Sequence, residues 1–134
     1  MADKKKALVT GANGFIGSHL AEELVRRGWE VSCLVRRLHG LGWIESLDVH
    51  LMRGDCRDKP PLGPAVEGAD CVFHLAGVIS ALKWDEYYQA NVFGTRNLLE
   101  ACCERNPGLK KFVYVSSISA AGPSEKGRAL TEDD

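Results

Sequence analysis

One stretch, Lys6–Gly17, limits the possible folds of this chain more than any other part of its sequence. A short apolar run of strand-forming residues comes first, and a helical pattern follows glycines at Gly11, Gly14 and Gly17. Glycines let a chain turn sharply and let a ligand approach its backbone closely. The first amides of a helix have no partners inside the helix, and the helix dipole favours an anion beside them. The stretch therefore predicts a site for a phosphate-bearing ligand, with a plain strand-to-helix turn as the alternative.

Short apolar runs recur along the chain, and helical patterns separate them. Five strands are predicted, at Ala7–Thr10, Val31–Val35, Val49–Met52, Cys71–Leu75 and Phe112–Val115. Strands that alternate with helices form parallel sheets with right-handed crossovers, and continuous apolar strands are typical of sheets covered on both faces. We therefore expect a single α/β domain over residues 1–134. It should be a doubly wound, Rossmann-type sheet of strand order 3-2-1-4-5 in a three-layer αβα arrangement.

Two long helices are predicted by apolar residues that recur on one face. The first covers Gly14–Arg27, and the second and longest covers Trp84–Glu104. The predicted apolar face of the longest helix consists of Tyr88, Val92, Thr95, Leu99 and Cys102, extended by Leu98. Uncovered apolar surface on this helix would invite self-association, so a homodimer through residues 84–104 is a further expectation.

The segments between these elements carry weaker signals. Leu38–Ser46 is predicted to be a loop with one helical turn. Lys59–Pro64 is predicted to be a loop, because proline removes a hydrogen-bond donor and disfavours helix in the residue before it. A short helix is expected around Ala65–Glu67, and Gly122–Asp134 shows no element.

Composition and charge exclude several classes of function. The net charge of -1 predicts no nucleic-acid partner and no anionic membrane surface. No apolar run approaches the roughly 18 residues of a membrane span, and the lysines at the N-terminus lead directly into a strand. The five cysteines lack C-x-x-C spacing, which argues against a disulfide framework or a zinc site. A cytoplasmic protein without a metal centre is expected.

The end of the second predicted strand bears on the choice of cofactor. In a dinucleotide-binding fold, a residue about 20 positions after the glycines meets the adenosine ribose, and an acidic residue there favours NAD. Arg36 occupies this position, and Arg37 follows it. Because guanidinium groups bind phosphate well, this pair favours NADP(H) over NAD(H). NAD stays possible, and so does a solvated arginine pair with no ligand.

These residues begin a resemblance to a known family. TGANGFIG, at residues 10–17, resembles the glycine motif of the extended short-chain dehydrogenase/reductases. That group contains the NAD(P)-dependent epimerase/dehydratases and the dihydroflavonol-reductase-like enzymes. The resemblance implies that the stretch binds the cofactor, with contacts from Gly11, Asn13, Gly14, Phe15, Ile16 and Gly17.

Three later segments continue the resemblance in the family's order. The first is Gly54–Asp55, after the third predicted strand. The resemblance implies that Asp55 bonds the adenine amino group while Cys56 contributes its backbone, and a simple turn between Asp55 and Arg53 is the alternative. His74–Gly77 is similar to the family segment that lies along the adenosine ribose and diphosphate, which implies cofactor contacts from Leu75, Ala76 and Gly77. His74 itself is predicted to be a hydrogen-bonded core histidine. Asn91–Cys102 resembles the family's central helix, and Asn91 is implied to hold structure or water beside the site.

The resemblance reaches the active-site region and then departs from the family pattern. Phe112–Gly122 is similar to the strand that delivers the active-site hydroxyl, so Ser117 is implied to bond the substrate oxygen. The family's acid/base is a tyrosine assisted by a lysine four residues later. No Tyr-x-x-x-Lys occurs here: the residues four after Tyr87, Tyr88 and Tyr114 are Asn91, Val92 and Ile118. The sequence thus resembles a family member truncated just before its catalytic helix, and we expect it to be inactive alone.

Two functions follow from these observations. The resemblance implies the NAD(P)-binding portion of an epimerase, dehydratase or reductase. In the complete enzyme, hydride would pass between the nicotinamide and a sugar-nucleotide or a small carbonyl or hydroxyl substrate. The alternative is a non-catalytic NADP(H)-binding sensor or scaffold protein.

Overall fold

Five parallel strands form the single sheet of the computed structural model, which describes residues 3–134 except for the side chain of Lys126. The strands are β1 (Lys6–Thr10), β2 (Glu30–Val35), β3 (His50–Arg53), β4 (Cys71–His74) and β5 (Lys111–Tyr114). Their order is β3-β2-β1-β4-β5, and every neighbouring pair is parallel. The predicted fold class and strand order are confirmed, and the strand bounds differ by one residue at most ends.

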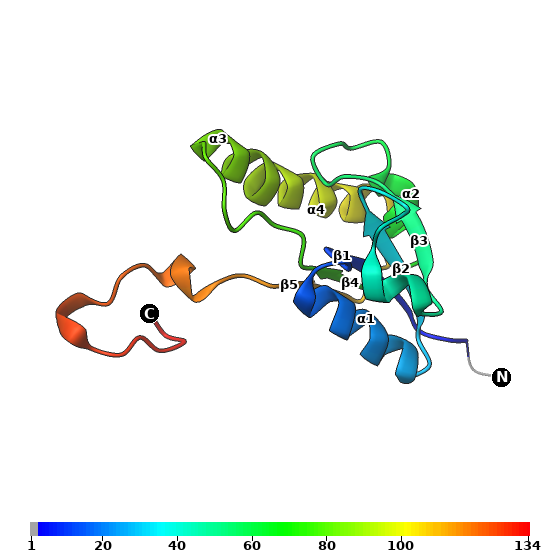
Figure 1. The fold of residues 1–134 in the computed structure, drawn as a ribbon, viewed down its shortest axis with the longest axis horizontal. Helices are drawn as coiled ribbons and strands as arrows, with labels where there is room; N and C mark the ends of the chain where they lie inside the picture. The colour runs from blue at the N-terminus through cyan, green and yellow to red at the C-terminus, as the bar shows by residue number, and fades with distance from the viewer. Residues whose placement is uncertain (1–2) are drawn as a thin grey trace.

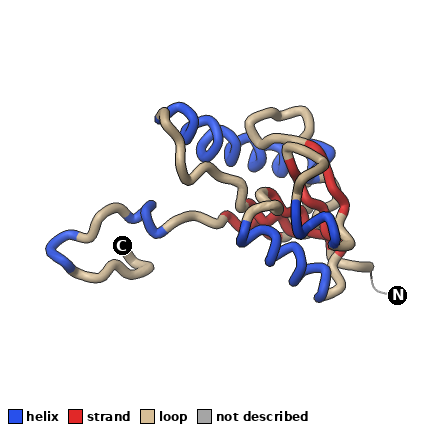
Figure 2. The backbone as a smooth tube through the Cα atoms, in the orientation of Figure 1, coloured by secondary structure: helices blue, strands red, loops and turns tan. Residues whose placement is uncertain are grey.

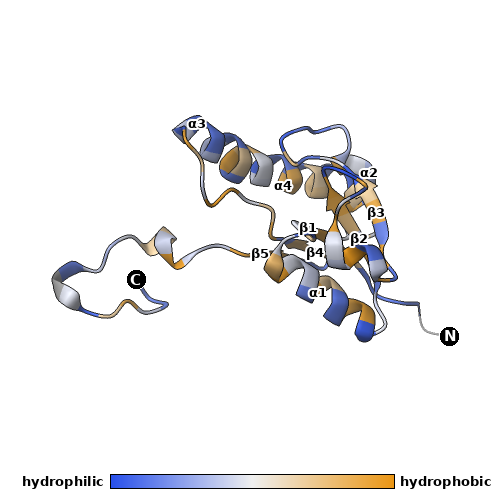
Figure 3. Ribbon diagram, viewed as in Figure 1, coloured by the Kyte–Doolittle hydropathy of each residue, from blue (hydrophilic) through white to orange (hydrophobic). Residues whose placement is uncertain are grey.

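Helices cover both faces of this sheet (Figures 1 and 2). Helix α1 (Phe15–Arg26) lies on one face, and α2 (Leu62–Val66) and α4 (Gly94–Arg105) lie on the other. Residues of β1 alternate between the two faces. Leu8 belongs to the core cluster under α2 and α4, whereas Ala7 and Val9 belong to the cluster under α1. The apolar strands at the centre of Figure 3 are therefore enclosed from both sides.

The longest helical run covers residues 84–105 and contains an irregularity that its sequence does not reveal. Helix α3 (Trp84–Tyr87) continues into a π-helical segment, η2 (Tyr88–Phe93), which continues into α4. The wider π turn takes up extra residues, so it rotates the residues after it relative to those before it.

The predicted apolar face of this run is therefore wrong in part. The buried side of α4 consists of Gly94, Asn97, Leu98, Ala101 and Cys102. Tyr88, Val92 and Leu99, which were expected on the core face, are exposed. The expectation of uncovered apolar surface on this helix is borne out.

Two of the weaker predictions also need correction or refinement. A 3-10 turn at Gly42–Ser46 (η1) is the single helical turn expected in Leu38–Ser46. Helix α2 begins inside the segment predicted to be a proline loop and includes Pro64. Proline fits there because the amides of a first helical turn have no partners within the helix.

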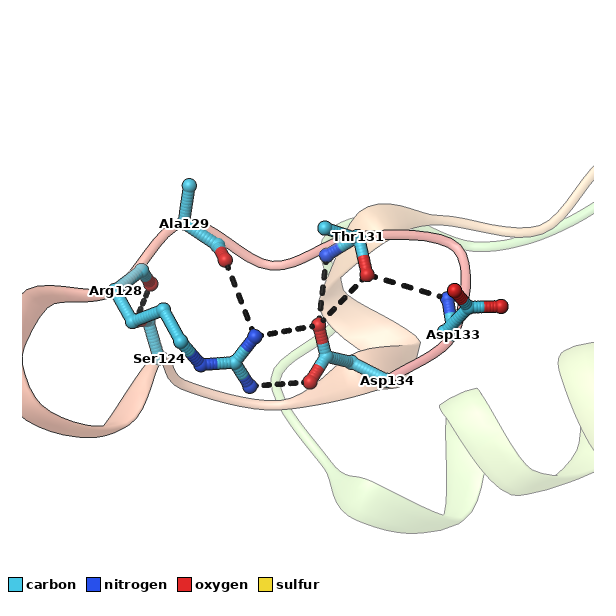
Figure 4. Close-up of polar contacts among 6 residues, drawn as sticks. All are labelled: Ser124, Arg128, Ala129, Thr131, Asp133 and Asp134. Atoms are coloured by element: carbon cyan, nitrogen blue, oxygen red, sulfur yellow. Dashed lines mark hydrogen bonds and ion pairs between the residues drawn. The ribbon is translucent and has the colours of Figure 1, made fainter.

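The segment after β5 extends away from the sheet and then turns back on itself (Figure 1). It contains two 3-10 turns, η3 (Ile118–Ala121) and η4 (Glu125–Gly127), so the prediction that Gly122–Asp134 has no element is wrong. Figure 4 shows the local polar contacts that hold this turn. Arg128 forms an ion pair with Asp134, and the Thr131 amide donates to Asp134 Oδ2 at 2.7 Å.

Within residues 3–134, no helix is long and apolar enough to cross a membrane. The same residues contain no group of three or more side chains placed to hold a metal ion.

Candidate functional site

The carboxyl ends of the parallel strands border a cleft of about 290 Å³, where doubly wound sheets place their ligands. The turns after β1, β2, β3 and β4 supply its walls. Nine residues predicted to bind a cofactor line it: Gly11, Asn13, Gly14, Arg36, Asp55, Cys56, Leu75, Ala76 and Gly77. The fold thus brings four separate segments of the sequence to one site.

The turn after β1 owes its shape to Gly11. This residue has a φ of +69°, a conformation that favours glycine. A Cβ atom there would lie 2.7 Å from the Ala76 nitrogen, so a side chain would collide with the backbone after β4. Gly11 therefore lets two walls of the cleft lie in direct contact. Gly17 is buried in α1 behind this turn, outside the cleft lining.

The N-terminus of α1 presents amides without partners. Gly14 is the N-cap residue, and it has no side chain with which to cap the helix. Among residues 3–134, the amides of Phe15, Ile16 and Gly17 donate no hydrogen bond. The first turn of α1 also contains no acidic residue. This helix end can therefore receive an external anion.

The side chains of Phe15 and Ile16 point to solvent, with exposures of 82% and 61%, and neither lines the cleft. Any contact that these two residues make with an anion would therefore come from their backbone amides. The sequence motif marks both positions but does not distinguish a backbone role from a side-chain role.

Two arginines follow β2, and the structure separates them. Arg36 lines the cleft and acts electrostatically on Asp55 across it. Arg37 is exposed and lies outside the lining. The predicted arginine pair therefore supplies one cation to this cleft.

Asp55 and Arg57 form an ion pair inside the cleft. Arg57 Nη2 donates to Asp55 Oδ2 at 2.7 Å, and the Arg57 amide donates to Asp55 Oδ1 at 2.9 Å. The Arg57 guanidinium lowers the pKa of Asp55, so this carboxylate is charged at neutral pH. A turn between Asp55 and Arg53 was the alternative expected from the sequence. Arg53 lies in β3, and Asp55 pairs with Arg57 instead.

The end of β4 is joined to β1 through a buried histidine. Thr10 Oγ1 accepts hydrogen bonds from the amides of Leu75 and Ala76, so its own proton is donated to His74 Nδ1 at 2.7 Å. On the other side, His74 Nε2 lies 2.9 Å from Thr95 Oγ1, whose proton goes to the carbonyl oxygen of Asn91. This pattern assigns a neutral His74 protonated at Nε2. Burial lowers the pKa of His74 to about 4, in agreement with the neutral form.

Asn91 holds the loop after β4. Its Oδ1 accepts from the Val78 amide at 2.7 Å, and its Nδ2 donates to the Val78 carbonyl oxygen at 2.9 Å. Asn91 lies outside the cleft lining, whereas Val78 is part of it. In this structure Asn91 acts on the cleft through Val78.

Ser117 lies apart from the cleft. It follows β5 as the N-cap of η3, and its Oγ accepts a hydrogen bond from the Ser119 amide at 3.1 Å. It is exposed and is not among the cleft residues.

Sequence reasoning missed several residues that line the cleft, among them Thr10, Arg57, Val78 and Ala90. Arg57 had a detectable signal, because opposite charges two residues apart in a turn can pair. The others are ordinary residues whose position depends on the strand register, and no local pattern distinguishes them.

The cleft combines groups that suit an adenine dinucleotide. It has open amides for a diphosphate beside Gly14, a cation at Arg36, and a carboxylate at Asp55. Gly11 permits close approach of a ligand to the backbone. The residues present therefore fit a nucleotide cofactor.

Comparison with known proteins agrees with this geometry. Residues 7–134 match the NAD dependent epimerase/dehydratase family. A sterol demethylase protein B of Methylococcus capsulatus is 34% identical over 122 residues, which cover 90% of this chain and 37% of that protein. A UDP-N-acetyl-alpha-D-glucosaminuronate decarboxylase of Bacillus cytotoxicus is 37% identical over 139 residues, which cover 98% of this chain and 41% of that protein. A putative dihydroflavonol 4-reductase of Synechocystis is 33% identical over 126 residues, with 92% and 36% covered.

Solved structures show the same relationship. MoeE5 in complex with UDP-glucose and NAD superposes with a TM-score of 0.80 and 34% identity, covering 96% of this chain and 41% of that one. A uronate dehydrogenase from Agrobacterium tumefaciens has a TM-score of 0.70 and 26% identity, with 85% and 41% covered. The chain spans about two fifths of the length of these relatives. It belongs to the NAD dependent epimerase/dehydratase family of extended short-chain dehydrogenase/reductases.

Proposed function

We propose that this chain is the dinucleotide-binding portion, in one domain, of an NAD(P)-dependent epimerase, dehydratase or reductase. The observation that carries the proposal is the run of open amides at residues 15–17, directly after Gly14 in the cleft wall. The cofactor diphosphate would accept hydrogen bonds from these amides. Its adenosine would occupy the part of the cleft between Arg36 and Asp55.

The preferred cofactor in this proposal is NADP(H). Arg36 offers a guanidinium where a 2′-phosphate would lie, and no carboxylate follows β2 in its place. NAD is the competing choice, because MoeE5 is described in complex with NAD. Arg37, exposed and outside the lining, contributes less than Arg36 in this proposal.

The reaction of the complete protein would be hydride transfer. The nicotinamide would supply or accept hydride at a carbinol or carbonyl carbon of a sugar-nucleotide or another small substrate. The role proposed for Ser117 is to donate a hydrogen bond to the substrate oxygen. Its Oγ accepts from the Ser119 amide, which leaves the hydroxyl proton free for this role. Because the chain contains no Tyr-x-x-x-Lys, we expect no turnover from residues 1–134 alone.

A non-catalytic NADP(H)-binding sensor or scaffold is the second candidate. It is favoured by the position of Ser117, which lies outside the cleft. A coding sequence that continues beyond Asp134 into a Tyr-x-x-x-Lys helix would refute this candidate.

Self-association and location complete the proposal. The exposed apolar side chains Tyr88, Val92 and Leu99 form a surface on η2 and α4 through which two copies could pair as a homodimer. All five cysteines are free thiols, and three of them are buried, which fits a reducing compartment such as the cytoplasm.

Isothermal titration of the chain with NADP(H) and NAD(H) tests the proposed function. The wild type should bind NADP(H) more tightly, and Arg36→Asp should reverse the order because it replaces the cation by a group that repels phosphate. Lys4→Asp is a control that reverses an exposed charge. Lys4 lies before the amino end of β1, whereas the cleft lies at the carboxyl end of this strand. No binding of either cofactor would refute the site, and equal affinities in the wild type would refute the role of Arg36 alone.

A further inference from the structure

We propose that Arg57 is a positioning residue that orients Asp55 for adenine, and that it makes this cleft select adenine over a 6-oxopurine. The inference rests on the proposed function, because it concerns the base of the bound dinucleotide. Asp55 and Arg57 both line the cleft, in the turn that follows β3.

The ion pair leaves Asp55 a limited set of free acceptor positions. Oδ1 accepts from the Arg57 amide at 2.9 Å and from Nε at 3.1 Å. Oδ2 accepts from Nη2 at 2.7 Å and shares the Nε proton at 3.2 Å. Each oxygen thus accepts one full hydrogen bond and a share of the Nε proton, and each keeps part of its acceptor capacity for a ligand. Arg57 therefore fixes the direction in which the Asp55 carboxylate meets a ligand.

The backbone of the turn is held from the other side by α4. The buried Asn97 donates through Nδ2 to the carbonyl oxygens of Cys56 and Arg57, at 3.0 Å and 3.3 Å. The Asp58 amide donates to the Asp55 carbonyl oxygen at 2.9 Å. With the backbone and the carboxylate both fixed, the turn offers a preformed edge to a base.

This edge carries an acceptor and a donor. The acceptor is the Asp55 carboxylate, and the donor is the Cys56 amide, which makes no hydrogen bond within residues 3–134. Adenine presents an amino donor at N6 and an acceptor at N1, which match this pair. Hypoxanthine presents an acceptor at O6 and a donor at N1, so both positions would be mismatched. The fixed edge therefore predicts discrimination between the two bases.

A second cation, Arg36, also acts on Asp55. Arg36, like Arg57, lowers the pKa of the Asp55 carboxyl group, and both arginines line the cleft. Without Arg57, Asp55 would turn toward Arg36, which is the only other cation acting on it among the described residues. The carboxylate would then be turned away from adenine.

The test compares two pairs of dinucleotides by isothermal titration: NADH and NADPH, each against the analogue in which hypoxanthine replaces adenine. The wild type should bind the adenine form about tenfold more tightly or better, since a mismatched polar edge costs at least that factor. Arg57→Gln should reduce the ratio to below about threefold. Arg57→Lys keeps the charge but cannot form the two-pronged contact, so its ratio should fall between the two. Asp58→Asn, an exposed change in the same turn, should leave the ratio unchanged.

The outcomes separate this inference from the proposed function. A variant that binds both dinucleotides with the wild-type ratio would overturn the role of Arg57 and leave the proposed function standing. If Arg57→Gln does not fold, the ratio in Arg57→Lys decides alone, and a wild-type value there overturns the role. If the wild type binds neither form of either dinucleotide, the proposed function and this inference both fail.

Discussion

A Cβ atom added at Gly17 would lie 2.1 Å from the carbonyl oxygen of Gly11. The same oxygen accepts a hydrogen bond from the Gly14 amide at 3.0 Å, so the backbones of Gly11, Gly14 and Gly17 meet at this oxygen. Helix α1 can approach the turn after β1 this closely only because Gly17 has no side chain. The spacing of the motif thus has a packing cause as well as a ligand-binding one.

Gly17→Ala should therefore damage both the fold and the cofactor site. The backbone must move to admit the methyl group, and an overpacked core site costs about 1–3 kcal/mol. Denaturant unfolding should show this loss, and titration should show cofactor affinity at least about tenfold lower. Gly108→Ala is the matched control, because a Cβ at Gly108 meets nothing within 4 Å. If both variants match the wild type, the packing role of Gly17 is wrong.

His74 should make the stability of the chain depend on pH. Its pKa is lowered to about 4 in the folded state, against 6.5 for an unperturbed histidine. The unfolded state therefore binds more protons than the folded state between pH 6.5 and 4. The stabilising contribution of neutral His74 is complete above pH 6.5 and is lost as the pH falls toward 4. A shift of this size corresponds to about 3 kcal/mol.

The measurement is the free energy of unfolding from denaturant titrations at several pH values in this range. His74→Gln removes the titrating group and should flatten the slope, whatever its effect on stability at pH 7. His39→Gln, at an exposed position after β2, should keep the wild-type slope. An unchanged slope in His74→Gln would show that the buried histidine does not cause the pH dependence.

The exposed face of η2 and α4 should support self-association. Val92 and Leu99 are 40% and 42% exposed there. Leu99→Lys should lower the association constant measured by sedimentation at least about tenfold, because it places a charge in an apolar contact. Ile118→Lys changes an equally apolar side chain on η3 and should have little effect. A wild type that stays monomeric at high concentration would remove the basis for this prediction.

Local sequence patterns account for much of the fold. The apolar run before Gly11, the helical period after it and the alternation along the chain are sufficient to predict a parallel sheet. Its strand order follows from the dinucleotide-binding fold that the glycine motif indicates. His74 was predicted to be a hydrogen-bonded core residue, and its contacts with Thr10 and Thr95 confirm this. These features could be predicted because each depends on neighbours in sequence or on the family's strand order.

The features that could not be predicted are an irregular helix and a contact distant in sequence. The π segment η2 shifts the helical register, so a regular period assigned Leu99 to the buried face where Asn97 and Leu98 lie instead. Asn97 reaches back to the carbonyl of Cys56, about 40 residues earlier, to hold the Asp55 turn. Neither feature leaves a signal in a local pattern, although both shape the cleft.

A single spectroscopic titration tests the central claim most directly. Amide chemical shifts of the ¹⁵N-labelled chain would be followed as NADPH or NADH is added. The largest changes should fall on the amides of Phe15–Gly17, Asp55–Arg57 and Leu75–Val78, with those on the exposed face of α4 unchanged. Absence of shifts at Phe15–Gly17, or shifts confined to α4 and β5, would contradict a dinucleotide site at the N-terminus of α1.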